Sequence, residues 1–205
     1  FHMLLFLDII SSIPEFCVID DNKIILQQKI AQNETDRLSD NIIQSYIEID
    51  KRLNLTKKLK KISTTVGPGS YTSLRVGSAF ISGLMISRKI PYCPLSIEDI
   101  LNFNSKKYSK KNIGIFITSS NNQEFLCYKN KNNIMEYYKI EKDKYSIPEH
   151  IELILFNKTK INKNNKLEQI QFSFLDEFYK NYNNLAFVTD SIIKPIYISN
   201  NQLLN

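Results

Sequence analysis

The run from Gly67 to Gly77 constrains the fold of this chain more than any other stretch. It reads Gly-Pro-Gly-Ser-Tyr-Thr-Ser-Leu-Arg-Val-Gly and holds three of the five glycines in the sequence. The β-rich residues 62–66 precede it, and the uncharged, largely apolar residues 76–86 follow it. This pattern predicts a strand, a sharp turn at the Gly-Pro-Gly triplet, and a helix whose start has hydroxyl residues available as caps. Because glycine is scarce elsewhere, we expect close backbone approach to be concentrated at this turn.

Strand and helix patterns alternate along the first half of the chain. A strand at 3–9 is followed by a hairpin of strands at 15–19 and 23–30, and residues 33–36 open a helix that ends near residue 53. After the turn we predict a helix at about 71–88. A strand at 91–95 and a helix capped by residues 96–99 come next.

The second half repeats the strand-rich pattern beyond a lysine-rich stretch at 104–112. The predicted elements are a helix near 173–181 and strands at 112–118, 124–128, 134–140, 151–156 and 186–188, with a polar loop at 157–166. This order predicts two linked α/β lobes, residues 3–104 and residues 105–205.

Charge and cysteine content narrow the class of protein. The net charge is +6, and lysines gather at positions 57, 58, 60 and 61 and again at 106, 107, 110 and 111. We interpret these lysines as solvated surface, with RNA binding as the alternative. Cys17, Cys93 and Cys127 are far apart and lack metal-ligand spacing, which favours a reducing compartment. With no apolar run of membrane-span length and no signal-peptide pattern, we expect a cytoplasmic protein without membrane contact.

The two longest predicted helices carry more apolar surface than one core face requires. In the first, Ile43 and Ile47 widen a stripe made by Leu38, Ile42, Tyr46, Ile49 and Leu53. The second has no charge from residue 76 to residue 86, and the pairs Ser73/Gly77 and Ala79/Gly83 place small residues one turn apart. Either both helices are buried in their own domain, or each has a second apolar face for a partner. We favour the second interpretation.

The sequence contains few residue patterns typical of phosphate-binding, metal-binding or catalytic sites. The turn into a helix at Gly67 to Ser70 offers N–H groups to an anion, but the glycine spacings of nucleotide-binding loops are absent, so we favour a structural turn over a phosphate site. His150 stands without the partners of a metal site. For Asp8, Asp20 and Asp190 we prefer strand-end or turn roles to catalysis. We therefore predict no catalytic residue, no metal and no cofactor.

The glycine-rich run resembles the signature of TsaB (YeaZ) proteins, which reads approximately Gly-Pro-Gly-Ser-Phe-Thr-Gly-Leu-Arg-Ile-Gly. Only Tyr71, Ser73 and Val76 differ in this chain. The preceding elements occur in the matching order, residues 91–98 resemble the next strand of that family, and residues 195–198 resemble its C-terminal Pro-x-Tyr-Leu element. On this resemblance the signature turn comprises Gly67, Pro68, Gly69, Ser70 and Arg75.

The resemblance implies an actin-like (ASKHA) fold of two lobes, with the second lobe shortened after residue 140. It further implies a non-catalytic scaffold that binds the paralogue TsaD. TsaD transfers a threonylcarbamoyl group to the adenosine next to the tRNA anticodon, and the ATPase TsaE joins the pair. Members of the family pair with TsaD through their first two helices, and isolated copies pair with themselves. The implied interface here is Leu38, Ile42, Tyr46, Ile49, Ser73, Val76, Gly77, Phe80 and Leu84.

Two departures from the family pattern bear on chemistry. Asp8 is followed by two isoleucines instead of Thr-Ser, and Gly114 is the only glycine after residue 83. A nucleotide in the chain's own cleft is therefore not expected. Two other functions stay open: a basic tRNA-binding module working through the lysines, and a catalytic TsaD-like or glycoprotease-like enzyme. The enzyme would need paired metal-binding histidines and glycine-rich loops, which the sequence lacks.

Overall fold

The computed structural model describes residues 3–141, 145–161, 167–189 and 192–198. Its first sheet has the strand order β3-β2-β1-β4-β5. The strands β1 (Met3–Asp8), β2 (Glu15–Asp20) and β3 (Lys23–Lys29) form an antiparallel meander. The strands β4 (Leu59–Thr65) and β5 (Tyr92–Leu95) extend the sheet on the other side of β1 and run parallel to it.

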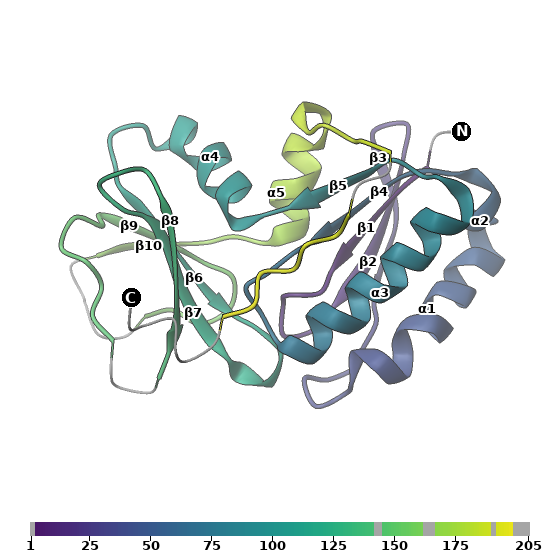
Figure 1. Ribbon diagram of the computed structural model, residues 1–205, viewed down its shortest axis with the longest axis horizontal. Coiled ribbons are helices and arrows are strands. Elements are labelled where there is room, and N and C mark those ends of the chain that lie inside the picture. Colours follow the sequence, from purple (N-terminus) through teal and green to yellow (C-terminus); the bar gives the residue numbers. More distant parts are fainter. Residues whose placement is uncertain (1–2, 142–144, 162–166, 190–191, 199–205) are drawn as a thin grey trace.

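The second sheet repeats this topology. The strands β6 (Ile113–Thr118), β7 (Glu124–Lys129) and β8 (Met135–Ile140) form the antiparallel meander. The strands β9 (Leu153–Phe156) and β10 (Glu168–Gln171) lie parallel to β6 on its other side, giving the order β10-β9-β6-β7-β8. Two sheets with one shared strand order, placed end to end (Figure 1), confirm the predicted two-lobed α/β architecture of the actin-like type.

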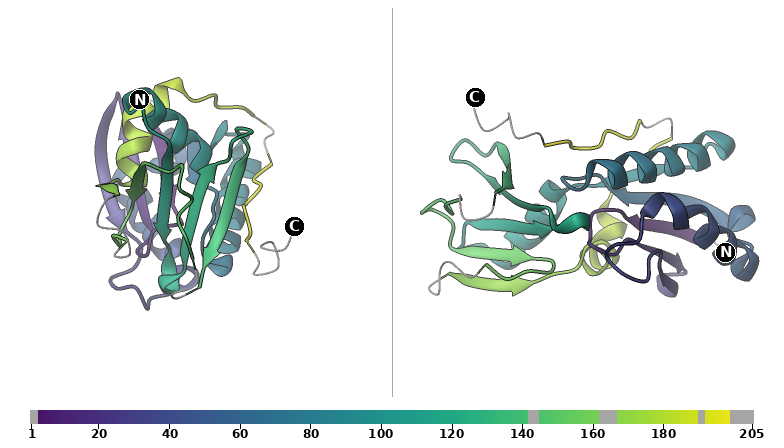
Figure 2. Two further views of the ribbon diagram at one scale, coloured as in Figure 1. Left: turned by 90° about the vertical axis from the view of Figure 1, so that its left-hand side faces the viewer. Right: turned by 90° about the horizontal axis from the view of Figure 1, so that it is seen from below.

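Helices cover both faces of the first sheet (Figures 1 and 2). On one face, α1 (Leu38–Leu53) and α3 (Tyr71–Arg88) enclose a core with β1, β2 and β4, and the short α2 (Leu55–Lys58) follows α1. On the other face, α4 (Ile97–Lys107) and α5 (Phe174–Asn181) share a core with strands of both sheets. Both faces of β1 are thus buried, which explains why its sequence is a continuous apolar run.

The described connections between parallel strands contain helices in the first lobe but not in the second. Where α1 with α2 and then α3 connect parallel strands in the first lobe, the described residues between β8 and β9, and between β9 and β10, form no helix. The second lobe is accordingly smaller, as the resemblance implies.

The predicted lobe boundary at 104/105 falls inside α4 and needs correction. The later helix α5 packs on the first sheet, where Phe178 stacks on Phe6 with ring centroids 4.3 Å apart. Val188 also exchanges two backbone hydrogen bonds with Tyr92 of β5, at 2.9 and 3.0 Å. The first lobe is therefore discontinuous in sequence, because its apolar second face is closed by residues near the C-terminus.

Local hydrogen bonds explain where several helices begin. Ser96 and Asp99 form a reciprocal capping box at the start of α4, as the sequence predicts. The helix α1 begins later than predicted, at Leu38. The Asp36 carboxylate accepts the backbone N–H groups of Gln32 and Asn33, at 2.9 and 3.2 Å, which fixes these residues in a turn rather than in a helix.

The three cysteines are buried and unbridged, and they serve as small residues of the core. Burial raises the pKa of Cys17 to about 12 and that of Cys93 to about 11. Thiols with such pKa values stay protonated at neutral pH and react poorly. In the part of the chain that the structure describes, no helix is long and apolar enough to traverse a bilayer.

Candidate functional site

The signature turn lies beneath a segment from the C-terminal end of the described chain. Gly67 has a positive φ of 111° and is joined to Pro68 by a cis peptide bond. A Cβ atom on Gly67 would lie 2.6 Å from the carbonyl oxygen of Ile196, whose N–H donates a 2.7 Å hydrogen bond to the Val66 carbonyl. The ring of Tyr71 packs on that of Tyr197, with centroids 5.0 Å apart. The two stretches that carry the resemblance thus contact each other.

The remaining signature residues do not form a catalytic constellation. Ser70 is buried before α3, and its side chain makes no capping hydrogen bond. Arg75 is exposed, with its guanidinium carbon 5.3 Å from the centroid of the Tyr71 ring. Among the described residues Arg75 makes no ion pair within 4 Å, so it contacts an aromatic face instead of anchoring the turn to a carboxylate.

Asp8 is buried at the end of β1 and accepts hydrogen bonds from its own turn and from the end of the neighbouring strand β4. Its Oδ1 atom accepts the N–H groups of Ile10 (2.9 Å) and Ser11 (3.2 Å) and the hydroxyl of Thr65 (3.2 Å). Its Oδ2 atom accepts the Ser11 hydroxyl at 2.5 Å. A carboxylate with these partners shapes the loop that leads away from β1, as the strand-end interpretation predicts.

The environment of Asp8 gives a pH-dependent prediction for the variants Asp8→Asn and Asp8→Ala. Burial raises the pKa of the Asp8 carboxyl above its ordinary value of 3.8, although its hydrogen bonds oppose this shift. Its contribution to folding is therefore fully present below that value and is lost as the pH rises through the pKa of the folded state. Asparagine carries no charge, so we expect the stability of Asp8→Asn relative to the unmodified chain to rise as the pH increases above the ordinary carboxyl pKa of 3.8.

Denaturant unfolding at several pH values measures this difference. The control is Asp8→Ala, which also lacks the charge but leaves the N–H groups of Ile10 and Ser11 without acceptors, so it should be about 1–3 kcal/mol less stable than Asp8→Asn at every pH. A difference between Asp8→Asn and the unmodified chain that does not change with pH would contradict the assignment.

The other acidic and histidine candidates show no shared site. Asp20 closes β2 at the first hairpin, and Asp190 lies outside the described residues. The half-buried His150 packs edge-on against Tyr128, with centroids 5.6 Å apart. Within the described ranges no three His, Cys, Asp or Glu side chains come close enough to hold a metal ion.

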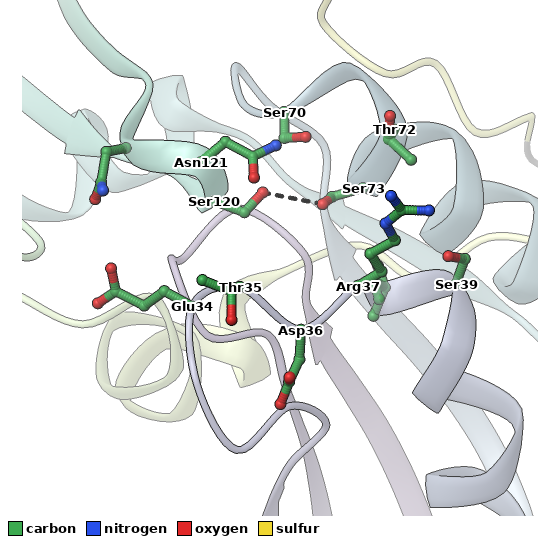
Figure 3. A pocket seen from close by; sticks show the side chains of 12 residues that line it. Glu34, Thr35, Asp36, Arg37, Ser39, Ser70, Thr72, Ser73, Ser120 and Asn121 are labelled. Atoms are coloured by element: carbon green, nitrogen blue, oxygen red, sulfur yellow. Dashed lines mark hydrogen bonds between the residues drawn. The ribbon is translucent and has the colours of Figure 1, made fainter.

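A cavity of about 800 Å³ opens between the lobes where α1 and α3 begin (Figure 3). The Ser73 and Ser120 hydroxyls join the lobes across it at 3.0 Å, and the Lys158 ammonium bridges to the Glu34 carboxylate at 2.5 Å. The lining is Glu34, Thr35, Asp36, Arg37, Leu38, Ser39, Ser70, Thr72, Ser73, Ser120, Asn121 and Asn122. The Arg37 guanidinium and the Lys158 ammonium are balanced there by the Glu34 and Asp36 carboxylates, so the cavity offers no net positive charge to a polyphosphate.

The structure corrects the predicted interface on α1. Leu38, Ile42, Tyr46 and Ile49 are all buried in the core beneath the helix. They are the face that contacts the sheet, because their spacing of three and four residues aligns them over β1 and β2. A partner that docks on the folded chain cannot reach them.

The structure also separates the predicted interface residues of α3. Ser73 and Gly77 are buried, and a Cβ on Gly77 would lie 2.5 Å from Cγ2 of Ile9. The close approach at Gly77 is therefore to the chain's own β1 loop. Val76, Phe80 and Leu84 are half-buried, so part of each side chain faces solvent.

A different set of residues forms the exposed apolar surface of the two helices. Ile43 is 56% exposed, Ile47 is 39% exposed and Ile86 is 82% exposed. On α3 the exposed Ala79 and Gly83 lie one turn apart, and a Cβ on Gly83 would meet no atom within 4 Å. We call this surface the outer helix face: Ile43, Ile47, Val76, Ala79, Gly83 and Ile86.

The two helices that carry the outer helix face are held together from beneath. The Tyr46 ring packs edge-on against Phe80 with centroids 5.3 Å apart, and Phe80 also packs on Phe16 of β2. This aromatic cluster fixes α1 beside α3 (Figure 1). The outer helix face is therefore a preformed surface shared by two helices, of the kind that another helix pair can meet.

Comparison with known proteins assigns the family. The profile of the family described as "TsaD: tRNA N6-adenosine threonylcarbamoyltransferase" matches residues 25–194. The chain belongs to the TsaD family. A curated relative is the tRNA threonylcarbamoyladenosine biosynthesis protein TsaB of Buchnera aphidicola subsp. Acyrthosiphon pisum, 30% identical over 131 residues. That match covers 62% of this TsaD-family chain but only 58% of the relative's length.

Solved structures extend the match to the whole fold. YeaZ from Pseudomonas aeruginosa superposes with a TM-score of 0.64 at 11% identity, over 97% of this chain and 100% of that one. A second structure, described as similar to peptidase YEAZ from the same organism, gives 0.57 at 13% identity with the same coverage. These identities establish a common fold. With the signature and the curated relative, they show that this TsaD-family chain is similar to TsaB (YeaZ) proteins.

Proposed function

We propose that this chain is the non-catalytic subunit that binds a TsaD-type subunit and supports threonylcarbamoyl transfer to the adenosine next to the tRNA anticodon. The outer helix face carries this proposal, since it combines large exposed isoleucines with a glycine that a helix can approach closely. Exposed apolar surface shared by two packed helices is characteristic of a protein-binding site. TsaE is the further component proposed for the assembly, and tRNA is its substrate.

The organisation of the cleft supports an accessory role. The Asp8 carboxylate at the end of β1 is bound by Ile10 and Ser11 of its own turn and by Thr65 of β4. The cavity between the lobes offers hydroxyls, amides and opposed charges. Its only strand-to-helix turn of glycines, at Gly67 to Gly69, is packed against Ile10 and Ile196. These features favour a lobe pair kept for binding over one arranged for chemistry.

The outer helix face also predicts how the chain behaves alone. An apolar surface that lacks its partner is covered most simply by a second copy of the same surface, which gives an isologous dimer. We therefore propose that the isolated chain forms a homodimer, and that the TsaD-type subunit competes for the same helices.

Size-exclusion chromatography with light scattering tests the proposed pairing. The chain alone and an equimolar mixture with TsaD from the same organism are run at micromolar concentration. We expect a one-to-one complex that forms at the expense of the homodimer, and threonylcarbamoyl transfer by TsaD that rises when the chain is added. Absence of any complex, with both subunits folded, would overturn the proposed function.

A further inference from the structure

Basic side chains gather at the end of the first lobe that lies farthest from the second lobe. There α1 and α3 end, α2 follows α1, and β4 begins (Figure 1). Arg88 at the end of α3 donates to the Lys57 carbonyl of α2 at 3.4 Å, which ties these segments together. We call this surface the basic end: Lys51, Arg52, Lys57, Lys58, Lys60, Lys61, Arg88 and Lys89.

The positive charge of the chain is concentrated at the basic end. Without these eight residues, the acidic residues of the chain outnumber the basic ones. All but Lys58 are exposed. A chain that carried lysines only because of its composition would spread them over the surface, whereas here residues 51–61 and the end of α3, which is distant from them in sequence, bring the basic residues to one end of the lobe.

Among the described residues, the exposed members of the basic end are not held in ion pairs, as is also true of Lys106, Lys107 and Lys110. Elsewhere, Lys111 pairs with Glu168, Lys129 with Glu98 and Lys158 with Glu34. Within the described ranges, none of the seven exposed members of the basic end has a carboxylate within 4 Å. The nearby Asp50 carboxylate accepts the backbone N–H of Thr56 at 2.6 Å.

Local structure explains only part of this charge. Basic residues in the last turn of a helix interact favourably with its dipole, which accounts for Lys51 and Arg52 in α1 and for Arg88 in α3. Lys60 and Lys61 lie on β4 and receive no such stabilisation. Lys61 is directed over the Phe187 ring, 5.0 Å from its centroid, so one ammonium of the cluster has a fixed position.

We propose that the basic end binds the phosphate backbone of tRNA. Exposed cations gathered at one end of a lobe suit a polyanion, because each phosphate contact releases condensed counterions. The basic end also adjoins the outer helix face: Ile47 lies one turn before Lys51, and Ile86 lies two residues before Arg88. An RNA held here would reach the subunit docked on those helices. The inference rests on the proposed role in tRNA modification.

Fluorescence anisotropy with a labelled tRNA transcript tests the inference, on the isolated chain and on its complex with TsaD. The test variant is Lys57→Glu/Lys60→Glu/Lys89→Glu. The matched control is Lys106→Glu/Lys107→Glu/Lys110→Glu, which changes the net charge equally at the exposed end of α4. We expect the test variant to weaken binding at least about tenfold at moderate salt and to lower the log–log salt slope by about 3. The control should change the affinity less than about twofold, because it alters only the long-range attraction due to net charge and removes no proposed phosphate contact.

Three outcomes would overturn the assignment. Equal weakening by both variants would mean that net charge alone drives binding, and no weakening by either would mean that the RNA binds elsewhere. Binding of anionic phospholipid vesicles, but not of tRNA, through the same residues would assign the surface to a membrane. Complex formation with TsaD is measured on the same samples. If the test variant does not weaken tRNA binding but the complex with TsaD still forms, the inference fails and the proposed function is unaffected. If the complex does not form, tRNA binding can still be measured on the isolated chain.

Discussion

Replacing Gly83 with leucine is expected to abolish pairing with a TsaD-type subunit while the chain stays folded. A Cβ atom at this position would meet no atom of the chain within 4 Å, so the backbone has room for a side chain there. Removing a glycine from a helix interior should even raise the free energy of unfolding by about 0.5–1 kcal/mol. On the outer helix face, however, the new side chain occupies the space that a partner helix would approach. We expect the affinity to fall at least about 100-fold.

Thermal unfolding and light scattering together check this prediction. The matched control is Ser105→Leu, which adds a leucine to the exposed surface of α4 and should leave pairing unchanged. A Gly83→Leu chain that is folded and pairs as tightly as the unmodified chain would show that α3 is not in the interface. Loss of pairing in the control would instead point to nonspecific association.

The same substitution at Gly77 should have the opposite consequence and destroy the fold. A Cβ there would lie 2.5 Å from Cγ2 and 3.2 Å from Cβ of Ile9, which is fully buried. Those atoms are close to the backbone of the β1 loop and cannot move without displacing it. We expect Gly77→Ala to lose about 1–3 kcal/mol despite the higher helix propensity of alanine, and Gly77→Leu to fail to fold at 37 °C.

A double-mutant cycle with Ile9 tests the cause of that loss. Ile9→Ala removes the clashing atoms and should itself cost about 2–5 kcal/mol as a cavity-forming change. In the double variant with Gly77→Ala the new methyl group partly fills this cavity, so the combined loss should be smaller than the sum by at least about 1 kcal/mol. Denaturant unfolding measures all three variants. Additive losses would show that Gly77 is not kept small by Ile9.

The pair of glycines illustrates how far the sequence determines the site. The small-residue pairs Ser73/Gly77 and Ala79/Gly83 are equally visible in the sequence, and both indicate close packing. Only the tertiary structure shows that Gly77 faces Ile9 while Gly83 faces solvent. The stripes of α1 pose the same problem, since periodicity reveals both Leu38/Ile42 and Ile43/Ile47 but cannot say which of them faces the sheet.

The fold itself was largely predictable where local signals are strong. Strands β1 to β4, helices α3 and α4 and the turn at Gly67 follow from apolar runs, capping residues and glycine. The strand β10 was missed, because Glu168–Gln171 has little apolar character and is defined only by its pairing with β9. The return of α5 to the first sheet also depends on a contact between residues far apart in sequence, which no local pattern encodes.

The late closure of the first lobe sets the order in which this protein can mature. A ribosome releases β1 long before α5, whose Phe178 covers Phe6, and before Ile196, which bonds to Val66 above the signature turn. Until those residues emerge, the part of the second face that α5 covers, including Phe6, stays exposed and available to chaperones. The helices that would meet a partner rest on that sheet. We therefore expect pairing with another subunit to follow synthesis of the complete chain. Chaperones would bind a truncated product at its exposed sheet before it could bind a partner.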